Sequence, residues 1–121
     1  MAKVFIVNKG GHDYSDAKRF GEVYFLSEGP ISKFAVSKIY REFAMQLRES
    51  TPADYILITG LTTMACIACS CFSFLHKGKL NMLLYKNGRY IERKLLLADL
   101  LTKSSNRDDK SQVEQIDDLT K

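Results

Sequence analysis

The stretch from Tyr55 to Leu75 restricts the possible folds most, because its 21 residues contain no charged side chain. A run of that length can span a bilayer as one helix. However, Gly60 interrupts it and several hydroxyl side chains make it only mildly apolar on insertion scales. We therefore predict a strand over residues 55–59, covered on both faces, and a helix over about residues 62–76 that is buried nearly all round.

The other elements follow from shorter patterns. Short β-branched and aromatic runs predict strands at residues 3–8, 22–27, 80–85 and 89–94, and Asn87-Gly88 predicts a hairpin between the last two. Apolar residues at helical spacing predict a helix that starts at Ser32, its expected N-cap, and continues through Glu49. Residues 95–101 are expected either to form a last short helix or to extend the fifth strand.

The order of these elements predicts an α/β fold. We expect a single small domain with a mixed, mostly parallel sheet of about five strands, two main helices and a C-terminal β-hairpin. Right-handed crossovers would make the second, third and fourth strands parallel. The domain is expected to cover residues 1–102 and a polar flexible tail residues 103–121. In that tail, Val113, Ile116 and Leu119 are compatible with a nascent helix over about residues 111–119.

Charge and cysteine content limit the class of protein. The net charge is +4, and residues 77–94 are locally basic. These basic side chains either attract phosphate or are simply the solvent-exposed side chains of a hairpin. Nucleic acid is not expected as a partner. The three cysteines, Cys66, Cys69 and Cys71, have no disulfide-framework spacing, and the N-terminal apolar run is too short for a signal peptide. A cytoplasmic location is therefore expected.

No cofactor or metal is expected. On a helix, Cys71 is rotated by about 140° from Cys66, so one ion could not reach all three thiols, which we interpret as small buried hydrophobic residues. The segment around Gly60 also lacks the lysine of a P-loop and the three glycines of a dinucleotide fingerprint.

A candidate ligand site lies where the predicted parallel strands end. Ligands of open α/β sheets bind beyond the carboxyl ends of the strands. The segment after residue 58 passes through a glycine into a helix whose free N–H groups would suit an anion. The residues expected to contact a ligand are Asn8, His12, Thr59, Gly60, Thr62, Thr63 and Lys86. Alternatively, Thr62 serves only as the N-cap of the second helix.

A second cluster lies in the loop after the first strand. His12, Asp13 and Asp16 gather a base and two carboxylates, which would suit a small hydrolase. The other interpretation is turn architecture with a surface histidine. Because no specific catalytic motif accompanies the cluster, we assign no catalytic residue and consider an enzyme the least favoured class.

Two segments resemble a known group of proteins. Residues 7–17 with Phe20-Gly21, and residues 55–62, are similar to small proteins of bacteriophages and mobile elements to which no activity is assigned. The resemblance covers about residues 3–95. It implies a protein that acts inside a bacterial host, by binding a host protein or a small nucleotide signal.

These observations leave two main hypotheses. The first is a non-enzymatic binding module for a phosphorylated or nucleotide-like ligand. The second is a protein-interaction module that binds and modulates a host protein, since the apolar second helix must be covered either by its own domain or by a second subunit, which would make a homo-oligomer.

Overall fold

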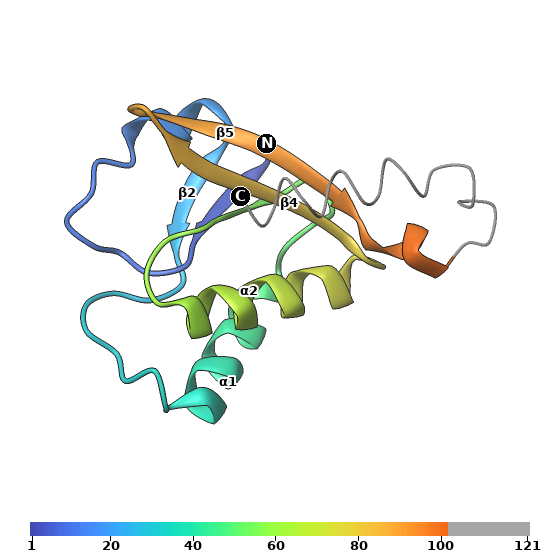
Figure 1. Ribbon diagram of the computed structural model, residues 1–121, viewed down its shortest axis with the longest axis horizontal. Coiled ribbons are helices and arrows are strands. Elements are labelled where there is room, and N and C mark those ends of the chain that lie inside the picture. Colours follow the sequence, from blue (N-terminus) through green and yellow to red (C-terminus); the bar gives the residue numbers. More distant parts are fainter. Residues whose placement is uncertain (102–121) are drawn as a thin grey trace.

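A computed structural model describes residues 1–101 of the chain, in which strands and helices alternate (Figure 1). The elements are β1 (Lys3–Ile6), the 3₁₀ helix η1 (Ser15–Arg19), β2 (Glu22–Phe25), α1 (Val36–Leu47), β3 (Tyr55–Leu57), α2 (Thr62–Leu75), β4 (Lys79–Lys86), β5 (Arg89–Leu96) and the 3₁₀ helix η2 (Leu97–Leu101). The predicted tail, residues 103–121, lies outside the described residues. Both expectations for residues 95–101 are met in part, because β5 continues to Leu96 and a short helix follows it.

The strands form one five-stranded sheet in the order β2-β1-β3-β4-β5. β1, β2, β3 and β4 run parallel, and only β5 is antiparallel to its neighbour. The hairpin that joins β4 to β5 turns at Asn87 and Gly88, which have φ values of 50° and 84°. Both values fit a turn of the kind that Asn-Gly favours. The predicted α/β class, mostly parallel sheet and C-terminal hairpin are thus confirmed.

Both helices pack on the same face of the sheet (Figure 1). The core on this face joins one apolar stripe of each helix to alternate residues of the strands. From α1 it takes Ile39, Phe43 and Leu47, and from α2 it takes Met64, Ala68 and Phe72, all of which are buried.

The loop that contains η1 covers the opposite face of the sheet. Tyr14 and Ala17 pack there against Leu57 of β3 and Leu83 of β4. Asp16 fixes the loop to the hairpin, since its Oδ2 accepts a hydrogen bond from the Tyr90 N–H at 2.7 Å. The central strand β3 is therefore covered on both faces, as its uninterrupted apolar sequence predicted.

Both predicted helix caps are wrong. α1 begins after Ala35, and the Ser32 hydroxyl instead accepts a bond from the Phe34 N–H (3.2 Å) within a preceding turn. α2 begins after Leu61, whose extended backbone makes it the N-cap, so Thr62 is already the first helical residue. The structure shows no side-chain hydrogen bond that caps either helix start.

The expectation that α2 is buried nearly all round is also wrong. Only one stripe of this helix meets the core, whereas Phe74 is 88% exposed and Cys66 is exposed as well. α1 lies beside α2 on the sheet rather than over it, so the outer face of α2 is left uncovered by residues 1–101. Among those residues, none of the helices combines the length and the apolarity needed to span a bilayer.

Candidate functional site

The strand order creates a switch point between β1 and β3, where the chain continues from β1 to β2 on one side and from β3 to β4 on the other. Asn8 and Gly60 meet at this point. Gly60 has a φ of +84°, and a Cβ added to it would lie 2.9 Å from the Cβ of Asn8. Glycine is therefore required here both for its backbone conformation and for the close approach.

The polar atoms of Asn8 serve the loops around this point. Its Nδ2 donates to the Gly29 carbonyl (3.2 Å), and its Oδ1 accepts from the Ser27 hydroxyl (2.9 Å). The single proton of that hydroxyl is shared with the Val7 carbonyl, whose oxygen lies 2.7 Å from the Ser27 Oγ. Asn8 therefore holds the ends of β1 and β2 together, and its side chain is already engaged within the protein.

A small cleft lies next to this point, and we call it the carboxyl-edge cleft. It has a volume of about 190 Å³ and is lined by His12, Asp13, Ile58, Thr59, Tyr85 and Tyr90. The structure thus brings His12 and Thr59, two of the predicted contacts, to one cavity. Its volume is below the roughly 300 Å³ at which pockets for drug-sized ligands begin.

Aromatic rings and one carboxylate determine the chemistry of the carboxyl-edge cleft. Tyr85 and Tyr90 pack edge to face with ring centroids 5.4 Å apart. Burial raises the pKa of Tyr90, so its phenol stays protonated at neutral pH. The Ser15 N–H donates to Asp13 and lowers the pKa of that carboxyl group, which is therefore charged. Such a cleft suits a small planar polar ring better than a phosphate.

The other predicted contacts lie elsewhere. Thr62 is exposed on the first turn of α2, Thr63 is half-buried beside it, and Lys86 is exposed at the end of β4. None of these three lines the carboxyl-edge cleft. Sequence reasoning missed Tyr85 and Tyr90, which stand directly opposite each other in the hairpin register. Because Asn87-Gly88 determines that register, the sequence alone could have shown that the two tyrosines are opposite each other.

The carboxylates of the predicted hydrolase cluster do not act together. Asp13 accepts its bond from the Ser15 N–H at 2.9 Å, whereas Asp16 is turned toward the hairpin and pairs with Arg19 at 3.2 Å. Asp16 also has a lowered pKa, chiefly because the Tyr90 N–H donates to it. His12 thus shares the carboxyl-edge cleft with only one of the two. Within residues 1–101, no group of three or more metal-ligating side chains is placed to hold an ion.

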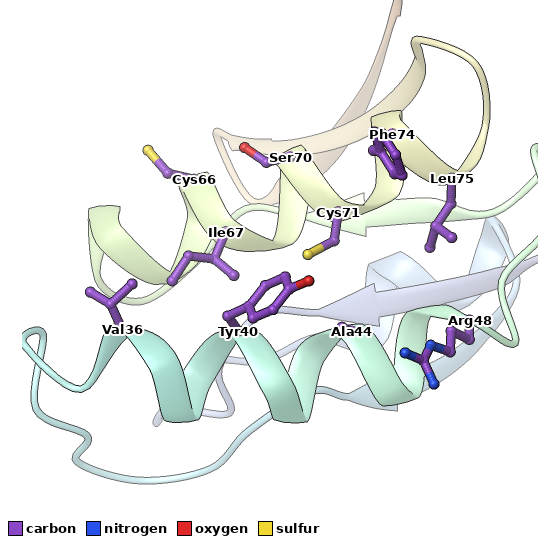
Figure 2. Close-up of a pocket in the computed structure, with 10 residues that line it drawn as sticks. All are labelled: Val36, Tyr40, Ala44, Arg48, Cys66, Ile67, Ser70, Cys71, Phe74 and Leu75. Carbon is purple, nitrogen blue, oxygen red and sulfur yellow. The ribbon is translucent and has the colours of Figure 1, made fainter.

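A larger cavity lies on the opposite side of the helices from the sheet, between α1 and α2, and we call it the interhelical groove. It has a volume of about 680 Å³ and is lined by Val36, Tyr40, Ala44, Arg48, Cys66, Ile67, Ser70, Cys71, Phe74 and Leu75. Figure 2 shows the Tyr40 ring between the helices, with Ile67 and Cys71 pointing toward it from α2. Arg48 and Leu75 lie at the same end.

Within residues 1–101, the interhelical groove is apolar and open to solvent. Phe74 is 88% exposed, Tyr40 55% and Val36 47%. Among the described residues that line it, Arg48 is the only charged one. The thiol of Cys71 is held protonated, because burial raises its pKa. The interpretation of all three cysteines as buried residues is wrong for Cys66, whose side chain points away from α1 at the rim (Figure 2).

One comparison with known proteins identifies a relationship. A family model described as phage Pam3 gp32-like protein matches residues 2–96, which include every strand and both α-helices. Neither the curated proteins nor the solved structures contain a significant match to this chain. The predicted resemblance to small phage proteins is confirmed, and the chain belongs to the family of phage Pam3 gp32-like proteins.

Proposed function

We propose that this phage-type protein is a protein-interaction module, and that its interhelical groove receives an amphipathic helix with acidic side chains from a bacterial host protein. One observation carries the proposal. An open, apolar groove of about 680 Å³ lies on the outer face of the two helices, away from the sheet.

Exposure of the groove residues supports an apolar partner. Soluble monomers rarely expose a contiguous apolar patch of more than about a few hundred Å² without a binding role. The exposed fraction is about half or more for Phe74, Tyr40 and Val36. By contrast, the core residues Phe43 and Phe72 of the same two helices are fully buried. Burying one such side chain at an interface contributes about 1.5–3 kcal/mol.

The shape and charge of the groove favour an acidic helix. α1 has 12 residues and is therefore about 18 Å long, which matches about three turns of a partner helix. Arg48 closes one end of the groove, and Arg41 lies two turns before it on the same side of α1. No carboxylate lines the groove in the described part of the chain. Acidic residues beside the apolar stripe of a partner would therefore meet Arg48 and no carboxylate of the groove lining.

Affinity capture with matched variants tests this proposal. The tagged full chain is used to capture proteins from a lysate of the bacterial host, beside Phe74→Asp and Met45→Asp. Both substitutions add a charge at an exposed apolar residue, but Met45 is 68% exposed on α1 and does not line the groove. We expect one stoichiometric partner that Phe74→Asp loses and Met45→Asp retains.

The captured segment provides the second criterion. Cross-linking of the complex followed by mass spectrometry should place an acidic amphipathic helix of the partner against α1 and α2. Equal capture by both variants, or a partner segment without apolar residues, would refute the proposal.

A nucleotide-like small molecule remains the second candidate, and the convergence of His12, Thr59 and Tyr85 on the carboxyl-edge cleft favours it. Base rings stack on exposed tyrosines, and Tyr85 is 62% exposed. A thermal-shift panel of nucleotides tests it, since a ligand that binds only the native state raises the melting temperature. Thr63→Glu, on the first turn of α2, should weaken any ligand that places a phosphate at the helix N-terminus. If no nucleotide shifts the melting temperature, this candidate is rejected.

A further inference from the structure

We infer that the interhelical groove is occupied in the full chain by the protein's own C-terminal segment, residues 113–119, which a host protein must displace. This inference rests on the proposed function, because it names the regulation of the same groove. Three features support it: the place where the described chain ends, the length of the residues that follow, and their pattern.

The described chain ends beside one end of the groove. The Leu97 N–H donates to the carbonyl of Gly78 at 2.6 Å. Gly78 follows α2 directly, and the Leu75 side chain at the end of α2 lines the groove beside Arg48 (Figure 2). η2 then leads away from this contact and ends at Leu101. The described chain therefore ends beyond the C-terminal end of α2, on the Arg48 side of the groove (Figure 1).

The chain after Leu101 is long enough to enter the groove. Residues 102–112 can span up to about 36 Å when extended, at roughly 3.3 Å per residue. The groove itself follows α1, whose length is about 18 Å. Segment 113–119 can therefore lie along most of it.

The sequence of the segment complements the groove. Val113, Ile116 and Leu119 recur at every third position, so a helix would gather them on one face. Residues 111–120 contain three acidic side chains, Glu114, Asp117 and Asp118, and no basic one. An apolar stripe with acidic flanks meets an apolar groove whose charged lining residue is Arg48.

Tethering makes such an internal ligand effective. A segment on a short linker acts at an effective concentration in about the millimolar range, so weak contacts suffice to keep a groove occupied. A host helix of the same chemistry would then bind with reduced apparent affinity, in proportion to the fraction of free groove.

The thiol of Cys71 reports whether the groove is covered. It lines the groove and its sulfur points toward Tyr40 (Figure 2). We would measure its reaction with a chromogenic disulfide at pH 8 in the full chain, with Cys66→Ser and Cys69→Ser as background. Ile116→Asp removes an apolar contact of the segment, and Gln115→Asp adds the same charge at the neighbouring position as the matched control.

The inference predicts that Ile116→Asp speeds the reaction and that Gln115→Asp does not. If the segment covers the groove about 80% of the time, the rate should rise by about fivefold. Equal rates in all three proteins would overturn the inference. A rate that falls with rising protein concentration would also overturn it, because a second copy would then cover the groove.

The two proposals fail separately. If Cys71 reacts equally in all three proteins while Phe74→Asp still abolishes capture, only the proposal that the C-terminal segment occupies the groove is refuted. If Ile116→Asp exposes Cys71 while Phe74→Asp captures normally, the proposed partner site is refuted and the proposal of internal occupation is supported.

Discussion

Replacing Gly60 by alanine tests the contact between two loops at the carboxyl edge of the sheet. The substitution has two costs. The first is the left-handed backbone at φ +84°, which disfavours alanine by about 1–2 kcal/mol. The second is the new Cβ, which would lie 2.9 Å from the Cβ of Asn8, closer than real contacts allow.

Relief of that overlap requires Asn8 to move. Its side chain then risks both hydrogen bonds, to Gly29 and Ser27, at about 1 kcal/mol each. The total loss of stability for Gly60→Ala is therefore expected to be about 3 kcal/mol. For a domain of this size, that corresponds to a fall in melting temperature of more than about 10 °C.

Gly88→Ala is the matched control, because Gly88 has the same φ of +84° and only the Tyr85 hydroxyl within reach, at 4.0 Å. Gly88→Ala has only the backbone cost, so its loss of folding stability is expected to be about 1–2 kcal/mol. Both variants are compared by urea denaturation at one pH. If Gly60→Ala loses no more stability than Gly88→Ala, the close approach at Asn8 is not tight and the reasoning is refuted.

Three further substitutions test the core, a buried carboxylate and a histidine. Phe72→Ala should cost about 3–5 kcal/mol in urea denaturation, because Phe72 is fully buried between α2 and the sheet, and a loss below about 1 kcal/mol would contradict this. Asp54→Ala should cost about 2–4 kcal/mol, because it leaves the N–H groups of Lys3 and Thr51 without their acceptor, and an unchanged melting temperature would contradict it. Burial lowers the pKa of His76 from its ordinary 6.5, so the unfolded chain binds the proton more readily and stability falls as the pH drops through 6.5. His76→Gln should remove this loss, as seen by comparing urea midpoints at pH 7.5 and 5.5, and an unchanged pH dependence would count against it.

Local sequence signals predicted most of the fold. Asn87-Gly88 determines the hairpin because both residues tolerate the positive φ that the turn requires. The apolar run before Gly60 similarly predicts a strand that is covered on both faces. In each case the signal lies within one short stretch of sequence, although the residues that cover β3 come from distant segments.

Predictions about surfaces were less successful, because they depend on distant partners. α2 contains almost no charge, yet whether its outer face is buried depends on where α1 packs, and α1 covers only one side of it. The predicted N-cap of α1 was wrong for a different, local reason. Ser32 has the chemistry of a cap, but its hydroxyl accepts a bond from the Phe34 N–H in a separate turn.

The candidate site was predicted only in part. The rule that ligands bind beyond the carboxyl ends of parallel strands led to His12 and Thr59, which share the carboxyl-edge cleft. It did not lead to Tyr90, which reaches the cleft because the hairpin folds against the η1 loop through Asp16. The interhelical groove was not predicted, because it arises only where two helices that are separate in sequence lie side by side.

Photo-cross-linking in living host cells tests the central claim most directly. A photoreactive benzoylphenylalanine is placed at Phe74 in the interhelical groove or, in a second protein, at Tyr85 in the carboxyl-edge cleft. Both side chains are aromatic and largely exposed, so the replacement is comparable at the two positions. We predict a covalent adduct with a host protein from position 74 and none from position 85. An adduct from position 85 alone would contradict the proposed function.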